Sequence, residues 1–257
     1  MKQTKYDDPG FFERYSHLPR SVDGLDGAGE WPAFQALLPA LVGMRVLDLG
    51  CGFGWHCRYA RMQGARAVVG VDISQRMLAR AVADTSDPGI EYKQSAIEDV
   101  KFHSSQFDVV ISSLAFHYIE KLDAVFRKII DWLAPGCSPV FSVEHPMFTA
   151  LAAQEWCFGP AGERRHWPVD NYHEEGVRHT NWMSEDVVKY HRTTASYLNL
   201  LIDCGFAITR LVEPTLTTQV VSQRPEWKDE HRRPMFLLVS AVKGDGLNSR
   251  TGQHHDE

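Results

Sequence analysis

The sequence predicts an α/β fold with a doubly wound, mostly parallel sheet, and three observations indicate it. Short apolar segments such as 44–50 and 67–71 alternate along the chain with segments of helical pattern. That alternation is typical of β-α-β units, whose strands lie parallel. The apolar segments contain few polar residues at alternate positions, as strands do when helices cover both faces of the sheet. The first segment also runs directly into glycines, as the first strand of such folds does at a ligand site.

The expected elements follow in chain order. A lead-in over 1–40 contains aromatic residues among turn formers and a short helix at 31–38, with Pro32 in its first turn. Ser74 is a candidate N-cap, and the Pro-Gly pair at 135–136 is expected to end a helix. The strands expected next are 44–50, 67–72, 91–94, 107–112 and 139–143, and the helices are 55–63, 75–83 and 122–133.

The alternation stops after the fifth strand. Residues 144–183 form a connection of 40 residues rich in Trp, Pro, Gly and His, where connections in α/β folds usually have about 2–6 residues. Such a segment either covers a site as a lid or is disordered, and its large aromatic residues favour a packed lid. Those aromatic residues are Trp156, Trp167, Tyr172 and Trp182.

The rest of the chain completes one domain over 1–243. A helix is expected at 194–204, followed by strands at 206–212 and 235–242. The polar tail 244–257 is expected to be disordered.

Composition argues against several functions. Lys and Arg number 27 against 33 Asp and Glu, so the net charge is −6 and no basic surplus favours nucleic acid or anionic membranes. The five cysteines form no CxxC pair, and the twelve histidines show no metal-binding spacing. Neither a signal peptide nor a membrane span of about 18 apolar residues is visible. We therefore expect a soluble, cytoplasmic protein without a metal ion.

The strongest functional signal is the segment 46–55, in which an apolar strand runs into Gly50, Gly52 and Gly54 before a helix. Glycines let the backbone turn sharply and approach a ligand. Asp72 ends the next strand 22 residues after Gly50. Its carboxylate is placed to accept hydrogen bonds from both hydroxyls of a ribose.

The spacing of the glycines separates two classes of cofactor. A dinucleotide site uses the pattern GxGxxG to bind a pyrophosphate, whereas here the pattern is GxGxG, with Asp48 two residues before Gly50. A carboxylate there would repel a pyrophosphate but suits a ligand with ammonium and sulfonium charges. A dinucleotide-dependent oxidoreductase remains as an alternative.

These segments resemble the motifs of class I S-adenosylmethionine-dependent methyltransferases, in their small-molecule (methyltransferase type 11-like) branch. The matching segments are 46–54, 71–78, 107–113 and 133–136, and the resemblance covers about 40–145. It implies a Rossmann-like sheet of seven strands with the last one antiparallel. It also implies S-adenosylmethionine as cofactor, S-adenosylhomocysteine as its product, and in-line methyl transfer to a small-molecule acceptor. A protein that binds the cofactor without transferring a methyl group is a further alternative.

The resemblance further implies the cofactor contacts. Asp72 would bind the ribose hydroxyls, and Asp48 would act through the loop or a water molecule. The family often has an aspartate 12 residues before the position of Asp108, where this chain has Ala96, so the adenine would rely on the backbone of Ile97. The full set of implied contacts is Tyr15, Asp48, Gly50, Cys51, Gly52, Asp72, Ile73, Met77, Ile97, Ser113 and Leu114. Arg20, in the lead-in, is placed either to pair with a carboxylate or to be solvated.

Three residues are candidates for the acceptor side. His145 follows the fifth strand at the same edge as Asp72, and as a general base it would supply about 10²–10⁴-fold. The alternative is a turn histidine bonded to the backbone. His117 and Tyr172 are candidate substrate-binding residues, ahead of His191. Because alignment of two reactants supplies about 7–11 kcal/mol, loss of His145 is expected to matter less than loss of Asp72.

Overall fold

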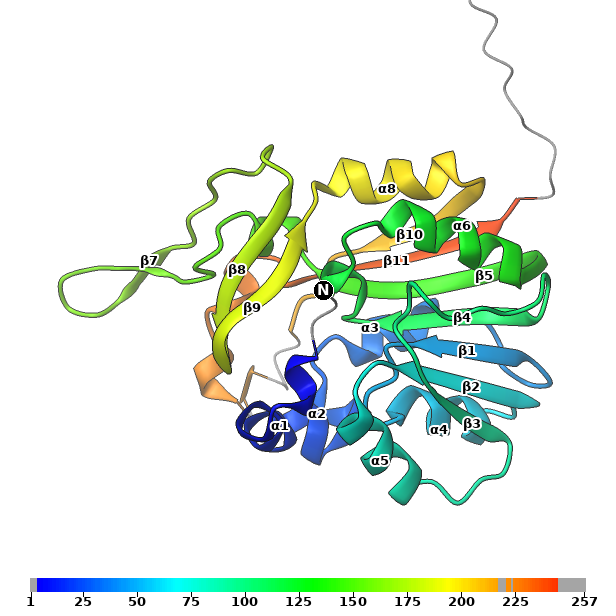
Figure 1. The fold of residues 1–257 in the computed structure, drawn as a ribbon. Helices are drawn as coiled ribbons and strands as arrows, with labels where there is room; N and C mark the ends of the chain where they lie inside the picture. Colours follow the sequence, from blue (N-terminus) through cyan, green and yellow to red (C-terminus); the bar gives the residue numbers. More distant parts are fainter. Residues whose placement is uncertain (1–3, 217–220, 223, 245–257) are drawn as a thin grey trace, which may run out of the picture.

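The computed structural model describes residues 4–216, 221–222 and 224–244 (Figure 1). Its centre is a sheet of seven strands in the order β10-β11-β5-β4-β1-β2-β3. The strands of the sheet are β1 (Arg45–Leu49), β2 (Ala67–Asp72), β3 (Ile90–Gln94), β4 (Phe107–Ser113), β5 (Leu133–Glu144), β10 (Phe206–Val212) and β11 (Phe236–Lys243). β11 runs antiparallel to both of its neighbours, β10 and β5, and the other adjacent pairs of strands in this sheet are parallel. The predicted seven-stranded sheet with an antiparallel last strand is confirmed.

Helices cover both faces of the sheet (Figure 1). They are α1 (Pro9–Ser16), α2 (Pro19–Val22), α3 (Trp31–Leu37), α4 (Trp55–Met62), α5 (Gln75–Ala83), α6 (Leu122–Trp132), α7 (Pro146–Thr149) and α8 (Thr194–Asp203). The short 3-10 helices are η1 (Lys5–Asp7), η2 (Gly24–Gly27), η3 (Phe116–Tyr118), η4 (Pro225–Trp227) and η5 (Glu230–Arg232). None of the helices in the described part of the chain is long and apolar enough to cross a bilayer.

Side chains alternate along the strands between two hydrophobic cores. Leu47 of β1 and Val110 of β4 pack with residues of α6 and α8. Their neighbours Val46 and Val109 point the other way and pack with residues of α3, α4 and α5. Strands buried on both faces explain the nearly continuous apolar runs in the sequence.

The expected N-cap is confirmed, and one predicted boundary is wrong. The Ser74 hydroxyl accepts a hydrogen bond from the Met77 N–H at 3.1 Å at the start of α5. The pair 135–136 does not form a turn between a helix and a strand, because β5 begins at Leu133, directly after α6. The pairing of β5 with β4 is interrupted there: Leu133 pairs with Phe107, and the next pair is Ser138 with Val109.

The insertion after β5 contains two small hairpins outside the main sheet. The hairpins consist of β6 (Cys157–Phe158) with β7 (Arg164–His166), and β8 (Gly176–Trp182) with β9 (Ser184–His191). Both lie to one side of the main sheet in Figure 1. The expectation of a disordered tail falls on 245–257, outside the described residues.

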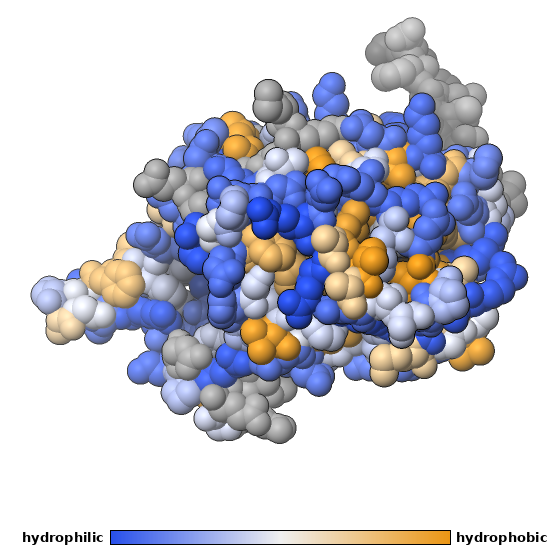
Figure 2. Space-filling model, turned by 60° about the horizontal axis from the view of Figure 1, so that its bottom comes forward, coloured by the Kyte–Doolittle hydropathy of each residue, from blue (hydrophilic) through white to orange (hydrophobic). Residues whose placement is uncertain are grey.

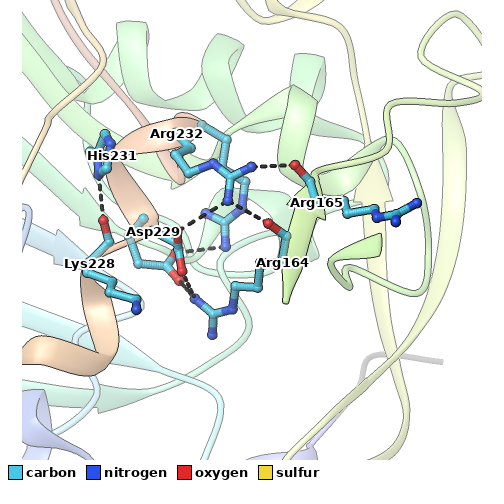
Figure 3. A network of polar contacts seen from close by, with 8 residues as sticks. Arg164, Arg165, Lys228, Asp229, His231 and Arg232 are labelled. Carbon is cyan, nitrogen blue, oxygen red and sulfur yellow. Dashed lines mark hydrogen bonds and ion pairs between the residues drawn. The ribbon is translucent and has the colours of Figure 1, made fainter. Parts of the chain in front are cut away.

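A network of arginines ties β7 to the segment that precedes β11 (Figure 3). Arg232 donates hydrogen bonds to the carbonyls of Arg164 and Arg165. Asp229 lies 3.2 Å from Arg232 and 3.6 Å from Arg164. Nearby, the Arg233 guanidinium lies 4.0 Å from the centre of the Trp167 ring. These contacts hold the insertion against the chain that leads into β11.

Hydrophobic and hydrophilic residues are mixed on the surface. On the face seen in Figure 2, hydrophobic residues occur in small groups among hydrophilic ones. Isolated exposed side chains of this kind, such as Val42 and Met62, are ordinary on a globular protein and need no partner to explain them.

Candidate functional site

A cavity of about 360 Å³ opens where parallel strands of the sheet end. Gly50 follows β1, Asp72 ends β2, Ser113 ends β4 and Glu144 ends β5, and all four line the cavity. The chain passes from β1 outward to β2 and β3 and then returns to place β4 on the other side of β1. Open α/β sheets bind ligands at this reversal of strand order.

The glycine loop forms one wall of the cavity through Gly50 and Gly52, which lack a side chain. Gly50 has φ +78°, and a Cβ there would lie 2.5 Å from the Cβ of Ala115. Gly52 has φ +52°. Left-handed φ values favour glycine, and the missing Cβ keeps the backbone open to the cavity. The N–H groups of Gly50 and Cys51 both donate to the carbonyl of Val71, at 2.8 and 3.0 Å, which fixes the loop on β2.

Backbone N–H groups hold the Asp72 carboxylate in place, and its oxygens can accept further hydrogen bonds. Its Oδ2 accepts from the Gly52 N–H and its Oδ1 from the Ser74 N–H, both at 2.9 Å. Burial raises the pKa of Asp72 above its usual value, partly offset by these donors. Since each carboxylate oxygen can accept two hydrogen bonds, both oxygens can still accept from a ligand.

An apolar slot continues from Asp72. Ile73, Met77, Ala96 and Ile97 line it, and Met77 and Ile97 are 3% and 7% exposed. Ala96 brings no polar group to the slot. Flat apolar walls of this kind suit a nucleobase held by packing.

Two of the expected cofactor residues lie outside this cavity. Asp48 is 1% exposed and lies behind the loop, where its Oδ2 accepts from the Cys57 thiol at 3.3 Å. Burial raises the pKa of Asp48 to about 7. Cys51 lines a smaller neighbouring cavity of about 70 Å³. Asp48 therefore lies beneath the glycine loop and does not line the main cavity.

The lead-in covers the opposite side of the cavity. Tyr6, Tyr15 and Arg20 line it. The Arg20 guanidinium donates to both carboxylate oxygens of Glu30, at 2.8 and 3.0 Å. Guanidinium has five N–H donors, so this pair leaves Arg20 able to bind a further acceptor.

A polar cluster at the end of β5 lines the rest of the cavity. Glu144 Oε1 is 2.6 Å from the Lys189 ammonium, and Oε2 accepts from the Gln154 amide at 3.1 Å. Burial alone would raise the pKa of Glu144, but the charge of Lys189 and the hydrogen bonds from Lys189 and Gln154 outweigh it, and the pKa lies below its usual value. Glu144 is therefore ionised.

His117 lines the cavity beside Glu144. Its Nδ1 accepts from the Glu144 N–H at 3.3 Å, and burial lowers the pKa of His117 to about 4. The ring is therefore neutral, with its proton on Nε2. Such an imidazole donates a hydrogen bond and is a poor base.

The structure does not bring His145 or Tyr172 to the cavity, as its described lining residues show. The Nε2 of His145 bonds to Glu213 Oε1 at 2.8 Å, and its Nδ1 accepts from the Met147 N–H at the start of α7. The Tyr172 hydroxyl bonds to Thr194 at the start of α8. This geometry favours the alternative of a turn histidine, with one ring nitrogen bonded to the backbone and the other to Glu213; a role of His145 as general base stays a prediction.

Sequence reasoning missed Glu144, Tyr6 and Tyr118, which all line the cavity, whereas it had placed Trp182 in the lid. For Glu144 the sequence carried no signal, because residues 139–143 of β5 are all buried and show no alternation that would tell Glu144 from His145.

Comparisons with known proteins agree with this geometry. A family model described as a methyltransferase domain matches residues 46–136. The crystal structure of an S-adenosylmethionine dependent methyltransferase from Mesorhizobium loti is 47% identical, with a TM-score of 0.81 over 85% of this chain and 100% of that one. An uncharacterized Haemophilus influenzae protein is 36% identical over 253 residues, which is 94% of this chain and 98% of that protein.

A more distant relative covers only part of the chain. The malonyl-[acyl-carrier protein] O-methyltransferase of Enterobacter lignolyticus is 38% identical over 104 residues, 40% of each chain. The likeness over nearly the whole length to the Mesorhizobium loti structure favours a methyltransferase over the dinucleotide-dependent alternative. The chain belongs to the class I S-adenosylmethionine-dependent methyltransferases and is an enzyme of that family.

Proposed function

We propose that this enzyme transfers the methyl group of S-adenosylmethionine to a small-molecule acceptor by in-line displacement. The observation that carries the proposal is that one cavity contains both the glycine loop with Asp72 and an aromatic half with Glu144. Two reactants held side by side in that cavity gain the large advantage of alignment. The sulfonium cofactor supplies an electrophilic methyl group when it is bound.

The residues present fit that cofactor. Asp72 has free acceptor capacity for ribose hydroxyls, and Met77 and Ile97 form an apolar wall for the adenine. A Cβ at position 50 would clash with the Cβ of Ala115 at 2.5 Å, so this wall of the cavity depends on a glycine. We assign the methionine carboxylate to the remaining donors of Arg20, whose pairing with Glu30 orients the guanidinium.

We also infer that the insertion acts as a lid. The Trp182 ring lies 5.6 Å from Phe11 and 6.3 Å from Tyr15, between ring centres. The insertion and the lead-in therefore meet over the cavity, which Trp182 and Tyr15 both line. Closure of this kind excludes water from the reacting groups.

The test has two parts. Calorimetry should show binding of S-adenosylmethionine to the wild type and none to Gly52→Val, because a branched side chain at φ +52° distorts the loop. Incubation with the methyl-labelled cofactor and a metabolite extract should give a labelled product of low mass. A label found only on protein or nucleic acid would refute the small-molecule acceptor.

A cofactor with a chiral methyl group tests the displacement itself. In-line transfer inverts the configuration of the methyl carbon, so the product should show inversion. Retention would indicate two successive transfers through a group on the protein and would overturn the in-line mechanism.

A further inference from the structure

The charges that line the whole cavity carry information about the acceptor. Among the described residues that line the cavity, three are carboxylates, Asp72, Glu98 and Glu144, and one is a cation, Arg20. Arg20 is paired with Glu30, and its remaining donors are those that we assigned to the methionine carboxylate of the cofactor. An acceptor that carries a phosphate or carboxylate would meet repulsion here and no unpaired cation among those residues.

The walls near Glu144 are aromatic. Tyr6, Tyr118 and Trp182 line the cavity together with Phe148. The ring centre of Tyr6 lies 6.4 Å from that of Tyr118, and their hydroxyls are 3.4 Å apart. Aromatic faces beside a carboxylate are the surroundings that stabilise an ammonium group.

Glu144 offers charge and free lone pairs without being a useful base. Lys189 and Gln154 hold its two oxygens in place, and each oxygen can accept one more hydrogen bond. The Lys189 ammonium is 1% exposed and is absent from the described cavity lining, so it anchors the carboxylate from behind. Because Glu144 is held ionised and His117 neutral, neither suits the removal of a proton from a hydroxyl.

We propose that the acceptor is a primary or secondary amine on an apolar or aromatic body, and that Glu144 binds its nitrogen. This inference rests on the proposed methyl transfer and names the class of its substrate. The amine binds as its ammonium and gives one proton to water before transfer, which frees the nitrogen lone pair. That lone pair forms a bond to the methyl carbon while the bond from that carbon to sulfur breaks, and the electron pair of the broken bond stays on sulfur. The positive charge therefore moves from sulfur to nitrogen, beside the Glu144 carboxylate.

This charge movement explains why a carboxylate is useful at that place. A fixed negative group stabilises a transition state in which positive charge develops next to it. A phenolate or carboxylate acceptor would be destabilised by the same group. The product leaves as an ammonium, so the single proton of the reaction is the one that the substrate gave to water before transfer, and no base on the protein is required.

The experiment compares three probes of matched shape on the full chain saturated with S-adenosylhomocysteine. The probes are phenethylamine, 2-phenylethanol and phenylacetate, and their dissociation constants are measured by calorimetry. We expect the amine, which binds as its ammonium, to bind about tenfold or more tightly than the alcohol and the acid, because it alone adds an ion pair to the hydrogen bond with the Glu144 carboxylate. Glu144→Gln should remove that preference, leaving the amine and the alcohol within about threefold.

The control variant is Glu213→Gln. Glu213 bonds to His145, close to the end of β5, and is absent from the described lining of the cavity. This variant should keep the preference for the amine. Because Glu144→Gln leaves Lys189 buried without its anion, the double variant Glu144→Gln/Lys189→Met removes both charges together and should also lose the preference.

Specific outcomes contradict the inference. Equal binding of the three probes to the wild type, tighter binding of phenylacetate, or no binding of phenethylamine at millimolar concentration would each overturn it. Retention of the amine preference in the folded double variant would show that Glu144 only anchors the insertion. Binding of S-adenosylhomocysteine is measured first, so its absence refutes the proposed function, and its presence without an amine preference refutes only the acceptor class.

Discussion

Gly50 is the position where a single methyl group should affect both stability and cofactor binding. Gly50→Ala places a Cβ 2.5 Å from the Cβ of Ala115 at φ +78°. The left-handed conformation alone costs an L-residue about 1–2 kcal/mol. Overpacking against a neighbour that cannot rotate away adds about 1–3 kcal/mol. We therefore expect a loss of about 2–5 kcal/mol in the free energy of unfolding, measured by urea denaturation, together with weaker binding of S-adenosylmethionine in calorimetry.

Gly43 provides the matched control. It has φ +76°, nearly that of Gly50, but a Cβ there would meet no atom within 4 Å. Gly43→Ala should therefore lose only about 1–2 kcal/mol and bind the cofactor as the wild type does. If the two variants lose equal stability and both keep full affinity, the close approach at Gly50 has no energetic consequence and the assignment of the loop to the cofactor is wrong.

Three further changes test other parts of the site. Asp72→Asn should weaken S-adenosylmethionine binding about tenfold or more, because a charged acceptor becomes a neutral one; unchanged affinity in calorimetry would remove Asp72 from the cofactor site. Arg20→Met leaves Glu30, 3% exposed, without its partner and should cost about 3 kcal/mol in urea denaturation, much of it restored by adding Glu30→Met. The wild type should lose about 2–3 kcal/mol in the free energy of unfolding as the pH falls from about 6.5 to 4, and His117→Gln should not show this loss. In that range the unfolded histidine binds a proton and the folded one, with a pKa of about 4, does not; parallel curves of stability against pH would contradict the burial of a neutral ring.

Local sequence patterns were sufficient for the sheet and for the cofactor half of the cavity. The apolar runs of β1 and β2, the glycines that follow β1 and the acid that ends β2 are each encoded within a few residues. Parallel strands then bring their carboxyl ends to one edge whatever the rest of the chain does. Gly50, Gly52, Asp72, Ile73 and Met77 accordingly all line the cavity.

The boundary at β5 shows where local patterns fail. Pro135 and Gly136 are strong turn signals in sequence. Both nevertheless lie within β5, because β5 pairs with β4 before them, at Leu133, and again after them, from Ser138. Hydrogen bonds to a strand distant in sequence decided that boundary.

Tertiary structure determines which residues line the aromatic half of the cavity, where we place the acceptor. Tyr6, Tyr118, Glu144 and Trp182 come from the lead-in, η3, β5 and β8, and no spacing in the sequence links them. Which of two adjacent residues, Glu144 or the neighbouring histidine, faces the cavity depends on the register of β5 between β4 and β11, because a shift of one residue reverses every side chain. Local sequence thus determined the glycine-loop half of the cavity, where we place the cofactor, whereas long-range packing determined the aromatic half, where we place the acceptor.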